Sequence, residues 1–254
     1  MLLTIDIGNT NITLGLHTGD EIGMCWRIAT SLERTADEYG LQTVGFVQQA
    51  EIGRDAISAV AMASVVPSLT GTFVEMCESY LEQTPLVADA GVKTGVRILY
   101  DNPRQVGADR VADAAAVREM YGGPACIVDL GTATTFDAIS TEGDYLGGAI
   151  APGIEIAADA LFQRAAKLPR VDVIRPPSAI GRTTVHSIQS GLLFGYVGLV
   201  EGMVERFRNE LGSQMKVIGT GGLADMLARE TDVVQIIAPW LTLDGLRIIW
   251  KLNQ

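Results

Sequence analysis

The chain has 254 residues, of which 48% are hydrophobic and 28 are glycine, so it can bury a substantial core in two modest domains. Its net charge of −11 argues against nucleic-acid binding, because phosphate backbones are bound mainly by clustered Lys and Arg, and the sequence has no such cluster. Three widely separated cysteines, Cys25, Cys77 and Cys126, form no CxxC pair and favour reduced thiols in the cytoplasm.

The apolar segments predict no membrane partner. The first residues lack a basic region, and Asp6 interrupts their apolar run, so we expect no secretion signal. The longest uncharged runs, Ala56–Val74 and Thr183–Val200, contain Pro67 or a mixture of polar residues and glycine. Such runs are poor bilayer spans, and we expect no transmembrane helix.

The first half of the chain predicts strands followed by alternating helices and strands. Apolar alternation predicts three antiparallel strands over residues 2–7, 11–17 and 21–28. A helix near Ala36–Glu51, a buried strand over Ile57–Val66, a helix from Pro67 to about Leu81 and a short strand at Leu86–Ala88 are expected next. The stretch Gly91–Gln105 is irregular, and we place the domain boundary there, which gives domains 1–105 and 106–254.

The second half repeats this order. A helix over Ala108–Met120 precedes strands near 125–129, 134–140 and 145–151, and helices dominate the remainder. Thr184–Glu210 predicts one long helix whose Gly191, Gly195, Gly198 and Gly202 allow close approach within the chain or across a two-fold contact. After a strand at Met215–Ile218, the turn Gly219–Gly222 is either a nucleotide contact or a simple strand-to-helix connection.

Two segments echo each other across the halves. Each is an apolar strand that delivers Asp-x-Gly into a hydroxyl-rich turn, with Asp6 aligned to Asp129 and Gly8 to Gly131, an offset of 123 residues (129 minus 6). One isolated copy would fit an ordinary hairpin turn equally well. Two copies in register favour a duplicated fold with a nucleotide held between the copies.

The residues after each aspartate supply hydrogen-bond donors for phosphate. Glycine lets the backbone approach a phosphate group, which nearby amides and hydroxyls then bind. The donors are Asn9, Thr10, Asn11 and Thr13 in the first copy, and Thr132, Thr134 and Thr135 in the second. An aspartate would repel phosphate, so the expected partner of Asp6 is a cation or a cation-bound water.

A third segment, residues 100–110, suggests the chemistry. Gly107 followed by Ala-Asp-Arg at a helix start places Asp109 and Arg110 in the first turn. Asp109 can accept a hydroxyl proton during phosphoryl transfer while Arg110 binds an anionic group. Alternatively, Asp109 is only a favourable first-turn residue.

Six ordered motifs resemble one known family. They are Asp6-Ile-Gly-Asn-Thr-Asn, Arg34-Thr-Ala-Asp-Glu-Tyr-Gly, Asn102-Pro-Arg-Gln-Val-Gly-Ala-Asp-Arg, Asp129-Leu-Gly-Thr-Ala-Thr-Thr-Phe-Asp, Gly147-Gly-Ala-Ile-Ala-Pro-Gly, and Ile180-Gly-Arg-Thr-Thr through Ser190-Gly. Together they resemble the type III pantothenate kinases of the actin, sugar-kinase and chaperone ATPase superfamily. The resemblance implies an α/β fold of duplicated ribonuclease H-like (actin-like ATPase) domains, with mixed sheets flanked by helices and a cleft between the copies.

The resemblance also implies an activity, the ATP-dependent phosphorylation of pantothenate to 4′-phosphopantothenate, which is the first step of coenzyme A biosynthesis. Asp109 would be the catalytic base, Asp129 would hold a monovalent cation, K⁺ or NH₄⁺, and Asp6 would organise the Mg²⁺ of ATP. A homodimer is implied, in which Thr184 completes the partner's substrate pocket. The implied ATP-binding residues are Asp6, Ile7, Gly8, Asn9, Thr10, Asn11, Ile12, Thr13 and Thr132. The implied substrate-binding residues are Tyr100, Gly107, Ala108, Asp109, Arg110 and Thr184.

Two alternatives stay open on the sequence. A different small-molecule kinase of the superfamily would keep both phosphate turns but lack Tyr100 and the Gly-Ala-Asp-Arg sequence. A non-catalytic nucleotide-binding paralogue, acting as a regulatory accessory factor, could dispense with Asp109, which this chain retains.

Overall fold

A computed structural model describes residues 1–89 and 91–254, and the chain forms two compact units. The first unit comprises Met1–Tyr121 together with Leu241–Gln254, and the second comprises Gly122–Trp240. The boundary expected between residues 105 and 106 differs from this division. The helices α3 (Ala108–Met120) and α7 (Leu241–Leu252) both belong to the first unit, so that unit is built from two separate stretches of chain.

The first unit is organised around a five-stranded mixed sheet of order β3-β2-β1-β4-β5. The strands are β1 (Leu2–Ile7), β2 (Asn11–Thr18), β3 (Glu21–Ala29), β4 (Ala59–Ser64) and β5 (Leu86–Val87). The first three are antiparallel neighbours, as expected, while β4 pairs parallel with β1 and β5 pairs parallel with β4. The carboxyl ends of β1 and β4 therefore lie at the same edge of the sheet.

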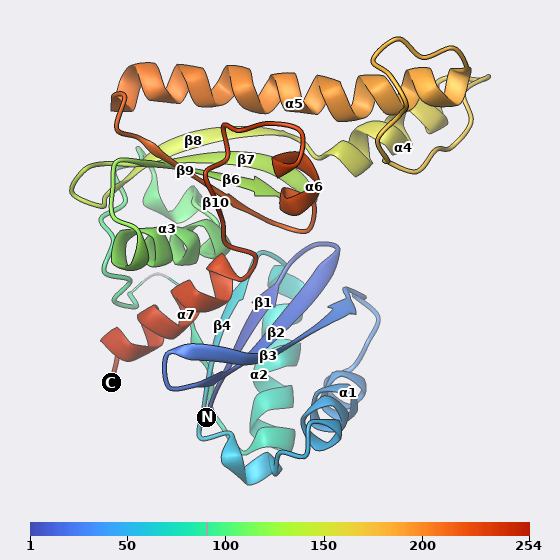
Figure 1. Cartoon of the computed structure of the whole chain (residues 1–254). Helices are drawn as coiled ribbons and strands as arrows, with labels where there is room; N and C mark the ends of the chain where they lie inside the picture. Colours follow the sequence, from blue (N-terminus) through green and yellow to red (C-terminus); the bar gives the residue numbers. More distant parts are fainter. Residues whose placement is uncertain (90) are drawn as a thin grey trace. The chain divides into compact units, whose positions relative to one another are not determined.

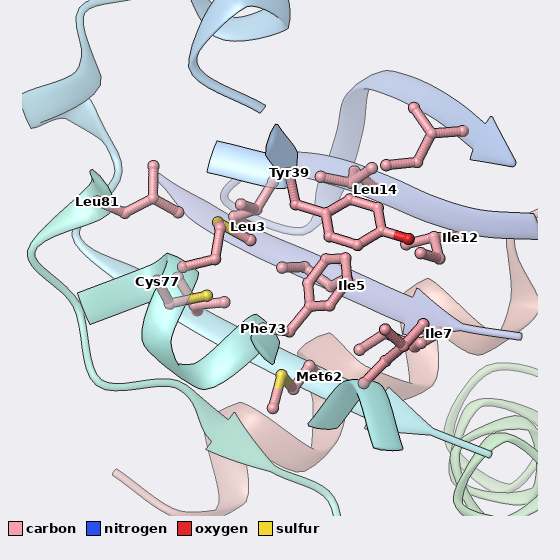
Figure 2. Close-up of a cluster of buried hydrophobic side chains, with 14 of the residues drawn as sticks. Leu3, Ile5, Ile7, Ile12, Leu14, Tyr39, Met62, Phe73, Cys77 and Leu81 are labelled. Atoms are coloured by element: carbon pink, nitrogen blue, oxygen red, sulfur yellow. The ribbon is translucent and has the colours of Figure 1, made fainter. Parts of the chain in front are cut away.

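Two helices supply the apolar core on one face of this sheet. They are α1 (Ala36–Gln49) and α2 (Pro67–Leu81), and Figure 2 shows Tyr39 and Phe73 from these helices packed against Leu3 and Ile5. The span of α2 is confirmed, since Pro67 occupies the first helical position, where its missing N–H costs nothing. The helix α1 ends at Gln49, and the chain then turns through Glu51, whose φ is 59°.

The last helix, α7, packs against α3 and reaches β1 and β4. A Cβ atom at Gly245 would overlap the carbonyl oxygen of Ala112, so this close approach requires glycine. At the start of α7, the hydroxyl of Thr242 donates to Asp113 Oδ1 (2.7 Å). Arg247, which is buried, donates to Asp20 Oδ1 (2.6 Å). These contacts attach residues 241–252 to the first unit.

The second unit repeats the sheet of the first. Its strands are β6 (Ala125–Leu130), β7 (Ala133–Ile139), β8 (Tyr145–Pro152), β9 (Lys216–Thr220) and β10 (Ile236–Ile237). Their order, β10-β9-β6-β7-β8, has the same antiparallel and parallel pairings as the first sheet. The prediction of a duplicated α/β fold with mixed sheets flanked by helices is thereby confirmed.

The helices of the second unit are α4 (Ile154–Arg164), α5 (Thr184–Leu211) and α6 (Ala224–Ala228). The long helix α5 lies across the sheet (Figure 1), and its side chains at Leu192, Val200 and Val204 are buried in the core with Val128 and Phe136. By length and composition, α5 is the one helix of the described residues that could cross a membrane. Buried side chains of α5, among them Leu192, Tyr196 and Val200, pack in the core of the second unit, and 44% of its most apolar window is buried within the chain. The sequence predicted no membrane span there.

Candidate active site

The first Asp-x-Gly turn follows β1. The amide of Gly8 donates to the carbonyl of Asn11 (3.0 Å) and closes the turn. Asp6 is half-buried at the end of the strand, and Asn9, Thr10 and Asn11 are exposed. The side chains of Ile7 and Ile12 are fully buried in the core, so of these two residues only the main chain can reach a ligand.

The second Asp-x-Gly turn follows β6 in the second unit. The amide of Gly131 donates to the carbonyl of Ala133 (3.1 Å), Thr132 is exposed, and Asp129 is half-buried. Two glycines that are distant in the sequence pack closely against the main chain of this turn. A Cβ atom at Gly153 would lie 2.7 Å from the carbonyl oxygen of Gly131, and one at Gly221 would lie 2.6 Å from the carbonyl carbon of Leu130. Backbone therefore packs directly on backbone around Asp129.

Asp109 lies in the first turn of α3, which begins as the sequence predicted. Its carboxylate oxygen Oδ1 accepts from the main-chain N–H of Arg110 (2.7 Å). A Cβ atom at Gly107, the residue that caps the helix, would overlap this same oxygen. Gly107 therefore leaves the space that the carboxylate of Asp109 occupies.

The first turn and the start of α3 meet at one edge of the first sheet. Val65 follows β4, and its amide donates to the carbonyl of Ile7 (3.0 Å). A Cβ atom at Gly107 would lie 3.4 Å from Cγ1 of the same Val65. The structure thus brings residues 6–13 and 107–110 together at the carboxyl ends of β1 and β4, where ligands bind in many open α/β sheets. Tyr100, which precedes α3 on an irregular stretch, is 39% exposed.

Thr184 lies in the second unit at the start of α5, capped by the side chain of Thr183, which accepts from the amide of His186 (3.2 Å). It lines a groove of about 1020 Å³ between α4 and α5. The other lining residues are mostly apolar and include Ile156, Leu161 and Leu192.

The cysteines take no part in a reactive site. All three are free thiols, as expected. Burial raises the pKa of Cys77 and of Cys126 to about 12, and burial together with the charge of Asp244 raises the pKa of Cys25 to about 11. The thiols are therefore protonated at neutral pH and are poor nucleophiles.

Comparison with known proteins decides the family. The family model for type III pantothenate kinase matches residues 2–206. A type III pantothenate kinase of Moorella thermoacetica is 52% identical over 253 residues, which span 100% of both chains. The chain belongs to the type III pantothenate kinase family. It is therefore a kinase that phosphorylates pantothenate with ATP in coenzyme A biosynthesis, as the motifs predicted.

Solved structures place this pantothenate kinase in the expected fold. A Campylobacter jejuni protein described as a Baf family transcriptional activator has a TM-score of 0.64 at 20% identity, covering 99% of this chain and 98% of its own. A Sinorhizobium meliloti protein described as a 2-dehydro-3-deoxygalactonokinase has a TM-score of 0.59 at 10% identity, covering 99% and 95%. These likenesses show the sugar-kinase type of fold and nothing of this chain's substrate.

Sequence reasoning missed residues that support the kinase turns. Gly153 and Gly221 lie within the glycine motifs 147–153 and 219–222, but only the fold reveals that they pack against the turn after Asp129. Thr30 carried no motif at all, although it hydrogen-bonds the first turn. Within the segment Arg34–Gly40, Thr35 and Glu38 form a capping box at the start of α1, and Gly40 admits the ring of Tyr80.

Proposed function

We propose that Asp109 is the general base of this pantothenate kinase. Its carboxylate takes the proton of the primary hydroxyl of pantothenate while that oxygen forms a bond to the γ-phosphorus of ATP. The bond from the γ-phosphorus to the bridging oxygen breaks, and ADP leaves with the electron pair. The product is 4′-phosphopantothenate. General-base assistance of this kind contributes about 10²- to 10⁴-fold to a rate.

One observation carries this assignment: Asp109 and the first Asp-x-Gly turn lie at the same edge of one sheet, linked through Val65. Phosphoryl transfer needs chiefly alignment and charge neutralisation, so a base beside a phosphate turn suffices for the protein's part of the chemistry. The surrounding residues Tyr100, Gly107, Ala108 and Arg110 are the proposed pantothenate contacts.

The phosphates of ATP bind through residues 6–13 of the first unit, and the family resemblance assigns a nucleotide contact to Thr132. Mg²⁺ accompanies ATP, and the half-buried carboxylate of Asp6 would supply one of its oxygen ligands at the first turn. Mg²⁺ held there would supply positive charge that offsets the negative charge of the phosphates during transfer.

Asp129 is the proposed ligand of a monovalent cation, K⁺ or NH₄⁺. Among residues 1–89 and 91–254, no three His, Cys, Asp or Glu side chains gather in a group that could hold a metal ion. Support for the cation comes from the family resemblance and from the place of Asp129, half-buried near the end of β6 beside the second Asp-x-Gly turn. The ion would offset the repulsion between Asp129 and phosphate.

A cytoplasmic homodimer is proposed, in which Thr184 contributes to the partner's substrate pocket. The groove between α4 and α5 supports it, because Thr184 shares that groove with apolar side chains, while Gly191, Gly195 and Gly198 leave the neighbouring face of α5 open. Sedimentation equilibrium should give twice the chain mass of 27.1 kDa, and a monomer that retains full activity would contradict the proposal.

Substitution of Asp109 tests the mechanism. In Asp109→Asn, kcat for pantothenate-dependent ADP release from Mg-ATP should fall by about 10²- to 10⁴-fold, because the amide cannot accept the proton. ATP binding, measured by calorimetry, should persist. The matched control is Asp55→Asn, whose carboxylate is 95% exposed and should leave both quantities unchanged. Near-normal turnover in Asp109→Asn would remove Asp109 from the mechanism.

A further inference from the structure

The carbonyl groups of the first Asp-x-Gly turn are held by one residue far along the chain. Thr30 lies directly after β3, and its hydroxyl donates to the carbonyl oxygen of Gly8 (2.7 Å). The main-chain amide of Thr30 donates to the carbonyl oxygen of Thr10 (3.0 Å). Two carbonyls of a four-residue turn are thus directed toward a single threonine.

This arrangement orients the amides of the turn. A trans peptide is planar, so its N–H points opposite to its C=O. The carbonyl of Gly8 shares a peptide plane with the amide of Asn9, and the carbonyl of Thr10 shares one with the amide of Asn11. Fixing both oxygens on Thr30 therefore aims the two N–H groups away from Thr30. A turn that binds phosphate needs its N–H groups toward the ligand and its carbonyl oxygens turned away from it.

Thr30 is itself anchored to the core of the first unit. The next residue, Ser31, donates its amide to the hydroxyl oxygen of Tyr39 (3.1 Å), and this hydroxyl donates to the carbonyl of Ser31 (2.9 Å). Tyr39 is fully buried, and its ring centroid lies 4.6 Å from that of Phe73 (Figure 2). Two helices therefore fix the position from which Thr30 holds the turn.

We propose that Thr30 is a positioning residue for ATP, whose hydroxyl presets the amides of Asn9 and Asn11 for the phosphates. This role rests on the proposed binding of ATP phosphates by residues 6–13. Thr30 needs no contact with the nucleotide, because its effect passes through the peptide planes of the turn.

The test compares Thr30→Val with Thr30→Ser. Valine keeps the shape and the main-chain amide of Thr30 but loses the hydroxyl, whereas serine keeps the hydroxyl. For Thr30→Val we expect the KM for ATP, and the Kd for ATP measured by calorimetry, to rise about 2- to 10-fold, the factor that the loss of one hydrogen bond gives. The KM for pantothenate should stay within experimental error, and Thr30→Ser should restore the ATP values.

Two further variants separate positioning from general destabilisation. Tyr39→Phe removes the hydroxyl that holds Ser31 and should raise the KM for ATP by a smaller factor than Thr30→Val. Ser58→Ala removes a hydroxyl that bonds to Met1, at the opposite end of β1, and should leave the KM for ATP unchanged.

Several results would overturn the inference. They are an unchanged KM and Kd for ATP in Thr30→Val, equal losses for ATP and pantothenate, or no rescue by serine. Failure of the proposed function looks different, because the unaltered protein would then bind no ATP or release no ADP with pantothenate. Calorimetry with ATP alone still tests Thr30 when only turnover is lacking.

Discussion

The two Asp-x-Gly turns end equivalent strands of equivalent sheets, yet they differ in length. In the first hairpin Asp6 pairs with Thr13, and in the second Asp129 pairs with Thr135, so the second loop is one residue shorter. The closing hydrogen bond changes accordingly, from Gly8 to Asn11 in the first turn to Gly131 to Ala133 in the second. The offset of 123 residues between the copies therefore holds only up to the turn.

The two turns also differ in what supports them. Hydrogen bonds from Thr30 hold the first turn, whereas the second is enclosed by backbone at Gly153 and Gly221. Residue Gly153 is itself fixed through its neighbour Pro152, whose carbonyl accepts from the hydroxyl of Tyr196 (2.6 Å). A repeated motif thus specifies strand, turn and strand, while each unit supplies its own support from distant residues.

The largest effect is expected for a substitution at Gly153. In Gly153→Ala the new methyl group would overlap the carbonyl oxygen of Thr132, and backbone cannot yield as a flexible side chain can. We expect the free energy of unfolding to fall by about 1–3 kcal/mol, and most activity to be lost. Urea unfolding measures the first and ADP release the second. The control Gly45→Ala, an exposed position of α1 where nothing lies within 4 Å, should not destabilise the chain, and equal effects of the two variants would refute the packing argument.

A substitution at Gly221 would act directly on the carboxylate of Asp129. Gly221 and Gly212 have φ of 88° and 94°, so alanine is strained at both, but only at Gly221 would the methyl group overlap the carboxylate of Asp129. If Asp129 holds a monovalent cation, Gly221→Ala should raise the K⁺ concentration for half-maximal activity several-fold and reduce the rise in Tm that K⁺ gives. Gly212→Ala should change neither. If both variants respond to K⁺ in the same way, the space at Gly221 does not affect binding of the cation.

The smallest expected effect concerns the far ends of the hairpins. The first unit has a buried polar pair, Thr4 and His17, where the corresponding positions of the second unit are Ile127 and Ile139. The hydroxyl of Thr4 donates to the carbonyl of Gly15 (3.1 Å) and shares a hydrogen bond with His17 Nε2 (2.9 Å), while Nδ1 of His17 has no partner among the described residues. Burial, helped by the charge of Arg247, lowers the pKa of His17 to about 4.

The lowered pKa of His17 makes the free energy of unfolding depend on pH in a defined direction. Between about pH 6.5 and pH 4, His17 is protonated in the unfolded chain but neutral in the folded chain. The free energy of unfolding should therefore decrease as the pH falls from 6.5 toward 4. Replacing His17 by isoleucine, as in the second unit, should reduce this decrease. Urea unfolding of both proteins at pH 7 and pH 5 gives the comparison, and identical pH dependence would exclude His17 as its source.

The fold was largely predictable wherever the sequence carries local stop and start residues. Pro67 and Gly107 gave the exact beginnings of α2 and α3, and the alternation of apolar residues gave the strands to within two residues at most ends. The sequence could not assign α7, because an apolar helix pattern does not state its packing partner. That partner is set by Gly245 against Ala112 and by Arg247 against Asp20, contacts separated by more than 100 residues.

The sequence predicted the turns of the site, but not the distant residues that hold these turns in place. The motifs located both turns and Asp109. Only the fold reveals that the side chains of Ile7 and Ile12 are buried, so that these two residues can contact a ligand through their main chain alone. Thr30 lies twenty residues beyond Thr10 in a segment without a motif, so no local pattern could connect them.

The discontinuity of the first unit has a consequence for synthesis in the cell. Its sheet precedes residues 122–240 in the chain, but α7, which packs on α3 and β1, follows them. The ribosome delivers the second unit as one uninterrupted stretch, which can fold as soon as it emerges. The first unit must wait, incomplete, until residues 241–252 are made, so the half that begins earlier finishes later.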